Sequence, residues 1–79
     1  MQERVYEILK SLCGVDEVFE TDKLREDLAI DSIGMVGLLV EVEAAFGIEL
    51  EESDINPEVL ITVFDVICLV GKYININEV

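Results

Sequence analysis

Apolar residues recur at helical spacing in three segments of the chain, and this periodicity constrains the fold more than any other feature. In the first segment, Val5, Ile8, Leu9 and Leu12 fall at positions i, i+3, i+4 and i+7, which is the spacing of one buried helix face. Gly14 follows shortly after, and glycine accepts the left-handed conformation that often ends a helix. The pattern predicts a first helix over residues 2–12.

A second helix is predicted from Ser32 to residues 46–47. Serine is a good N-cap residue because its hydroxyl accepts a hydrogen bond from an unpaired amide of the first turn, and Gly47 supplies the stop. A long connection, residues 15–31, joins the two helices, and loops of this length in small domains are often functional. We expect it to be ordered by apolar side chains that reach into the core, namely Val18, Phe19, Leu24, Leu28 and Ile30.

Two further helices are predicted in the last third of the chain. Asn56 as cap and Pro57 at the first helical position indicate a short third helix. The last helix is expected to begin at Thr62, with Asp65 three residues on as an approximate capping box, and to end at residues 73–74. The chain is therefore predicted to be all-α, a four-helix bundle with a short third helix and a long loop between helices one and two. It reads as a single domain, residues 1–79.

The apolar stripes of the second and last helices define the expected core. Its positions are Met35, Leu38, Leu39, Val42, Ala45 and Phe46 in the second helix, and Val63, Val66, Ile67, Val70 and Ile74 in the last. The last helix is apolar beyond this stripe, at Phe64, Cys68 and Leu69. Either that helix is more enclosed than usual, which we favour, or the extra residues leave a patch for a partner or for self-association.

Charge and composition restrict the function. Eighteen acidic residues against five basic ones give a net charge of −13, which repels nucleic acid and anionic membrane surfaces and speeds encounter with basic partners. Disorder is disfavoured because 52% of the residues are hydrophobic and regularly spaced. The sequence contains neither a signal segment nor an apolar run of about 20 residues, so we expect a cytoplasmic monomer without membrane insertion. Cys13 and Cys68 lack metal-ligand or disulfide-framework spacing and are expected to be reduced.

Catalysis is disfavoured by size and by residue inventory. A domain of 79 residues buries only about 60% of its unfolded surface, so an enclosing pocket is hard to build. The chain has no histidine, which excludes a Ser-His-Asp triad. Asp27 and Asp31 invite interpretation as a hydrolytic carboxylate pair, but solvated charges on a surface loop are the better account. No segment follows the calcium-loop pattern, so we expect neither an enzyme nor a metal site.

The segment Leu28-Ala29-Ile30-Asp31-Ser32-Ile33 resembles the Asp-Ser-Leu attachment motif of the acyl carrier protein family, with Ile33 in place of the usual leucine. The preceding Leu24-Arg25-Glu26-Asp27-Leu28 is similar to the stretch that leads into the motif. Downstream, residues 42–50 are similar to the family's helix end and the apolar residues that follow it. The resemblance extends over the whole chain in length, helix order and spacing.

This resemblance implies a function and a site. Ser32 would carry a 4'-phosphopantetheine arm, transferred from coenzyme A by a phosphopantetheinyl transferase, and Asp31 would be recognised by that transferase. The thiol of the arm would hold an acyl group as a thioester and present it to separate enzymes of fatty acid or secondary metabolite biosynthesis, after loading by a ligase or synthase. Two alternatives stay open: an aminoacyl carrier of the D-alanyl or peptidyl type, and an unmodified interaction module with a carrier-like fold.

The outer face of the second helix is unusual for the family. In the acyl carrier proteins of fatty acid synthesis that this chain resembles, the outer face of the second helix is usually acidic. In this chain the same face has small or apolar residues. A helix that only covers a core places charges on this side. We therefore predict that partners dock by close apolar packing, with two glutamates steering them; the residues are Ile33, Val36, Gly37, Val40, Glu41 and Glu43.

Overall fold

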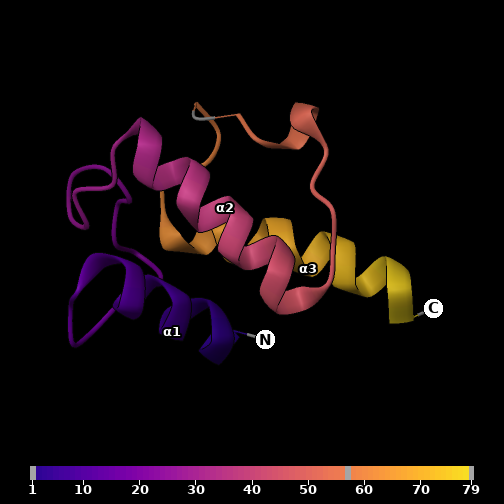
Figure 1. Cartoon of the computed structure of the whole chain (residues 1–79), viewed down its shortest axis with the longest axis horizontal. Helices are drawn as coiled ribbons and strands as arrows, with labels where there is room; N and C mark the ends of the chain where they lie inside the picture. Colours follow the sequence, from indigo (N-terminus) through magenta and orange to yellow (C-terminus); the bar gives the residue numbers. More distant parts are fainter. Residues whose placement is uncertain (1, 57, 79) are drawn as a thin grey trace.

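The computed structural model describes residues 2–56 and 58–78 and contains three α-helices (Figure 1). These are α1 (Gln2–Cys13), α2 (Ser32–Phe46) and α3 (Val63–Glu78), and a 3-10 turn η1 (Glu52–Asp54) lies between the last two. The described residues form no strand; their one extended pairing is an isolated antiparallel bridge between Lys23 and Thr62. The all-helical class predicted from periodicity is thus confirmed. Within the same residues, no helix is both long and apolar enough to cross a bilayer.

One apolar cluster holds the three helices together. α1 packs against both α2 and α3, and no polar side chain is buried among the described residues. Burial of apolar surface from water is therefore the main stabilising term. The buried residues are Val5, Ile8, Leu9, Val18, Leu24, Leu28, Ile30, Met35, Leu38, Leu39, Val42, Leu50, Leu60, Val63, Val66, Ile67, Leu69 and Val70. Nearly all predicted core positions are in this set, and Ala45, Phe46 and Ile74 pack against it half-buried.

Four apolar side chains do not behave as predicted. Phe19 was expected in the core but is 57% exposed, and Leu12 is also exposed at the end of α1. In α3, the expected enclosure is right for buried Leu69 but wrong for Phe64, which is 50% exposed, and for exposed Cys68. The reason for the error at Phe19 is that a loop has no period, so the sequence cannot say which of its side chains turns inward.

The segment between α2 and α3 differs from the predicted short third helix. It contains η1 and then a turn in which the amides of Val59 and Leu60 both donate to the Asn56 carbonyl. The Asn56 side chain accepts from the Glu58 amide at 2.9 Å, so Asn56 caps a turn, as its residue type favours. Pro57, the expected first helical residue, lies outside the described residues.

Backbone hydrogen bonds fix the long connection between α1 and α2 against the start of α3. The Leu24 amide donates to the Ile61 carbonyl at 2.8 Å, and the amides of Val63 and Phe64 donate to the carbonyls of Asp22 and Glu20. Main-chain amides at a helix start otherwise lack partners. The connection therefore caps α3, and it places the starts of α2 and α3 at the same end of the molecule (Figure 1).

The predicted capping box at the start of α3 is confirmed. The Asp65 carboxylate accepts from the amides of Thr62 (2.9 Å) and Ile61 (3.0 Å), and the Asp65 amide donates to the Thr62 hydroxyl at 3.3 Å. The bond from the Thr62 amide is the main reason that the pKa of Asp65 lies below its usual range. The ionised carboxylate therefore stabilises the folded state.

We expect Asp65→Ala to lower the free energy of unfolding by about 1 kcal/mol near neutral pH, the usual effect of losing a cap. Because the folded-state pKa is lowered, the stabilisation is present above the unfolded-state pKa and is lost as pH falls through the folded-state value. The difference between wild type and variant should thus shrink below about pH 4. Urea unfolding at pH 7 and pH 3 measures it, and a pH-independent difference would contradict the role of the charge.

Candidate functional site

Asp31, not Ser32, caps the start of α2. Asp31 has extended backbone angles (φ −89°, ψ −171°), and its Oδ1 accepts a hydrogen bond from the Gly34 amide at 2.7 Å. The Met35 amide makes the first helical bond, to the Asp31 carbonyl. The sequence-based assignment of the cap to Ser32 is therefore wrong by one residue. Both residue types are favoured N-caps, so residue type alone cannot separate them.

This displacement leaves the Ser32 side chain free. Ser32 is the first residue of α2 and is exposed. Among the described residues, no group forms a hydrogen bond with its hydroxyl. The hydroxyl also lies at a helix N-terminus, where unpaired amides and the helix dipole favour a nearby anion. The Ser32 hydroxyl is thus accessible for modification, and its position at the helix N-terminus suits a phosphate ester.

The loop before Ser32 is held from both sides. Leu28 and Ile30 are buried, and the amides of Leu28 and Ile30 donate to the carbonyls of Lys23 and Leu24. Between them, exposed Ala29 adopts a left-handed conformation with φ of +55°, which costs a residue other than glycine on the order of 1 kcal/mol. Packing of the two flanking side chains offsets this cost and fixes the position of the Asp31-Ser32 pair at the surface.

An open hollow of about 320 Å³ adjoins Ser32, lined by Arg25, Ala29, Ile30, Asp31 and Ser32. Arg25 is one of only five basic residues in the chain, and the sequence alone predicts no role for it. Its position in this hollow puts a cation beside the serine, where it would attract a phosphate. The sequence shows only that Arg25 lies seven residues before Ser32. This spacing does not predict that the two residues line one hollow, because that depends on how the loop folds.

The two carboxylates considered as a hydrolytic pair are each bound to the backbone of their own turn. One oxygen of Asp27 accepts from the Lys23 amide and one oxygen of Asp31 from the Gly34 amide, both at 2.7 Å. Asp27 does not line the hollow beside Ser32. Both carboxylates therefore shape the loop that leads to Ser32.

The predicted docking residues of α2 divide into two groups. Ile33, at 83% exposure, lies on the outer face with exposed Val36 and Val40, and Gly37 lies beside them half-buried. Glu43 is different, because it is half-buried and its carboxylate accepts from the Leu50 amide at 2.9 Å. One oxygen of Glu43 is thus already used to hold the chain that follows α2.

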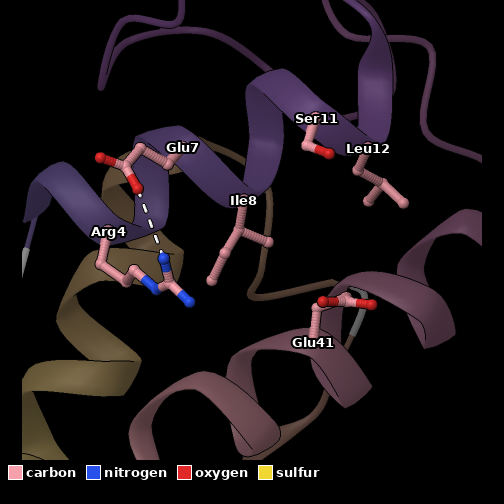
Figure 2. A pocket seen from close by; sticks show the side chains of 6 residues that line it. All are labelled: Arg4, Glu7, Ile8, Ser11, Leu12 and Glu41. Carbon is pink, nitrogen blue, oxygen red and sulfur yellow. Dashed lines mark hydrogen bonds and ion pairs between the residues drawn. The ribbon is translucent and has the colours of Figure 1, made fainter.

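Glu41 faces the cleft between α2 and α1 (Figure 2). This is an open hollow of about 500 Å³ between the two helices, in which Arg4 and Glu7 of α1 form an exposed ion pair at 3.4 Å. Ser32 is not among its lining residues, which are Arg4, Glu7, Ile8, Ser11, Leu12 and Glu41. This hollow is therefore separate from the hollow beside Ser32. Glu41 is exposed in it, next to the outer face of α2.

Two glycines of α2 differ in what surrounds them. A Cβ on Gly34 would lie 3.1 Å from Ile30 Cγ2 and 3.2 Å from Asp31 Oδ1, whereas a Cβ on Gly37 would meet nothing nearer than Leu12 Cδ1 at 4.0 Å. Gly34 thus lets the capping carboxylate and the buried Ile30 approach the helix. Gly37 has no such role within the chain.

We accordingly expect opposite effects from the same substitution at these two sites. Gly37→Ala should raise the free energy of unfolding by about 0.5–1 kcal/mol, because alanine is the better helix former. Gly34→Ala should lower it, because the crowded cap outweighs that gain. Urea unfolding of both variants checks the pair, and a similar stabilisation by both would contradict the tight packing around Gly34.

Comparisons with known proteins place the chain among carriers. A sequence model described as a phosphopantetheine attachment site matches residues 3–60. An acyl carrier protein of Thermotoga maritima is 35% identical over 71 residues, which cover 87% of this chain and 85% of the relative. A D-alanyl carrier protein of Enterococcus faecalis is 39% identical over 61 residues, covering 75% and 78%. An acyl carrier protein of Rubrobacter xylanophilus is 39% identical over 54 residues, covering 66% and 67%.

Proposed function

This chain belongs to the acyl carrier protein family, and on that premise we propose that Ser32 is the residue to which its 4'-phosphopantetheine arm is attached. The chain functions as a carrier protein, in accord with the attachment-site model that matches residues 3–60. The observation that carries the proposal for Ser32 is its exposed hydroxyl, which has no hydrogen-bond partner among the described residues because Asp31 makes the cap.

The residues around Ser32 fit a phosphodiester. The amides at the start of α2 and the Arg25 side chain in the adjoining hollow supply positive potential, which matters in a chain of net charge −13. When bound, the arm supplies a terminal thiol that holds the cargo as a thioester. The protein itself contributes tethering, which raises the local concentration of the cargo at each partner enzyme.

Asp31 has a second proposed role, in recognition by the phosphopantetheinyl transferase. Its Oδ1 is bound to the Gly34 amide, but the residue remains exposed beside Ser32. Asp31→Asn keeps an oxygen that can make the cap and removes the charge. A slower transfer to this variant, with unchanged stability, would separate recognition from folding.

An acyl group is the cargo that we propose, and an aminoacyl group is the second candidate. Relatives of both kinds are similar to this chain, an acyl carrier protein at 35% identity and a D-alanyl carrier protein at 39%. A third alternative is an unmodified interaction module. We further propose a single, non-catalytic, cytoplasmic domain over residues 1–79 that acts as a monomer, loaded by a ligase or synthase. In this domain η1 and the turn at Asn56 take the place of the short third helix of a four-helix bundle.

The outer face of α2 is the proposed docking surface for the enzymes that act on the arm. Ile33, Val36 and Val40 expose apolar side chains there, Gly37 allows close approach, and Glu41 is free to steer a basic partner. Val40→Glu should slow loading by the cognate ligase or synthase by about tenfold or more, because a carboxylate would be desolvated in the contact. Undiminished loading would contradict the assignment.

Intact-mass measurement tests the proposed attachment. The wild-type chain is incubated with coenzyme A, magnesium and a broad-specificity phosphopantetheinyl transferase. We expect a gain of one phosphopantetheine group per chain, located by peptide mapping on the fragment that contains Ser32. A chain that stays unmodified by a transferase active on another carrier protein would instead be an interaction module.

A further inference from the structure

Three apolar side chains lie exposed near the start of α3 and in the loop whose backbone is bonded to it. Phe19 and Phe64 each expose half or more of their surface, and Ile61 is 49% exposed. None of the three is needed to fill the core. Exposed apolar patches mark interaction sites, and aromatic residues are enriched at protein interfaces.

Backbone hydrogen bonds join the two segments that carry these residues. The Phe64 amide donates to the carbonyl of Glu20, the neighbour of Phe19, at 2.9 Å, and the Ile61 carbonyl accepts from the Leu24 amide at 2.8 Å. The Phe19 amide is itself bound to the Asp22 carboxylate. The exposure is therefore a feature of a fixed segment, and the ordering cost of binding there would be small.

A hollow beside Phe64 has the chemistry of a site for a basic side chain. Glu20, Thr21, Thr62 and Phe64 line this open hollow of about 390 Å³. Among the described residues, no cation pairs with the Glu20 carboxylate, and nearby Lys23 is paired with Glu26 at 3.2 Å. A lysine or arginine side chain can pack its stem against an aromatic ring while its charge meets a carboxylate.

We propose that Phe19, Glu20, Ile61 and Phe64, hereafter the Phe64 face, bind a partner protein that presents an apolar contact together with a lysine or arginine. The apolar side chains supply the contact area, and Glu20 selects the basic group. A second copy of this chain is a poor occupant, because each copy has a net charge of −13 and the two would repel each other. The face shares no residue with the proposed docking surface on α2, so one carrier can engage partners through two surfaces.

The test uses the full, unmodified chain, so its outcome does not depend on Ser32 chemistry. The ¹⁵N-labelled protein is titrated with a synthetic amphipathic helical peptide that carries leucines on one side and lysines on the other. We expect the largest amide shifts at residues 19–22 and 61–64. Phe64→Ser and Glu20→Gln should each weaken binding by about tenfold, the effect of losing roughly 1.4 kcal/mol of contact.

Matched variants and peptides decide the interpretation. Val59→Ser removes a similarly exposed apolar side chain that belongs to neither proposed surface and should leave the affinity unchanged. Glu20→Gln tests the face without removing any apolar packing. Three results would overturn the proposal: equal weakening by Val59→Ser, the same shifts with a peptide that has lysines but no leucines, or shifts that grow with protein concentration alone. The last would make a second copy the occupant.

Discussion

Ser32→Ala is expected to abolish transfer of phosphopantetheine to this chain and to leave its fold unchanged. The substitution removes the hydroxyl that would form the phosphodiester bond. Among the residues that the structure describes, it removes no hydrogen bond, because the cap of α2 is the Asp31 carboxylate and the Ser32 side chain is exposed. Alanine is also a better helix former than serine. Intact-mass analysis should therefore show no modified species, while the free energy of unfolding stays within about 0.5 kcal/mol of wild type.

The matched control is Ser53→Ala. Ser53 is also exposed and lies in the 3-10 turn η1, 21 residues after Ser32 in the sequence. This variant should be modified as fully as wild type. If the Ser32→Ala variant were still modified, or if the Ser53→Ala variant were not, the assignment of Ser32 as the attachment site would be wrong. A large loss of stability in Ser32→Ala would instead show that the hydroxyl holds the helix start, which contradicts the assignment of the cap to Asp31.

The parts of the fold that the sequence predicted well are those with local signals. The stops at Gly14 and Gly47 both have positive φ, 67° and 64°, as glycine after a helix predicts. The capping box between Thr62 and Asp65 could be predicted from the sequence because one helical turn fixes the spacing of its two residues. The core stripes of α2 and α3 were readable because helical periodicity repeats over four turns.

What the sequence could not provide depends on contacts between distant segments. The exposure of Phe19 follows from hydrogen bonds between residues 19–24 and 61–64, which no local pattern encodes. The position of Arg25 in the hollow beside Ser32 and the left-handed conformation of Ala29 likewise arise only when the loop folds. For the candidate site, the motif predicted Ser32 as the attachment residue from the sequence, but which of Asp31 and Ser32 makes the cap of α2 required the geometry.

Leu38→Ala is expected to remove much of the stability of the chain. Leu38 is fully buried in the middle of α2, and truncating a buried leucine costs about 2–5 kcal/mol, since a cavity is left behind. A domain of 79 residues has only about 4–12 kcal/mol in total. The urea midpoint should therefore fall strongly with little change in slope.

Val36→Ala is the control for the urea unfolding of Leu38→Ala. Together the two variants test which face of α2 is exposed, and Ser32 lies on that face. Val36 is 62% exposed, and its truncation should change stability by no more than about 0.5 kcal/mol. Two positions apart on a helix means about 200° of rotation, so Leu38 and Val36 report on opposite faces of α2. Ser32 precedes Val36 by four residues and therefore shares its face. Equal losses in both variants would mean that α2 is rotated about its axis, and Ser32 would then turn toward the core, where no transferase could reach it.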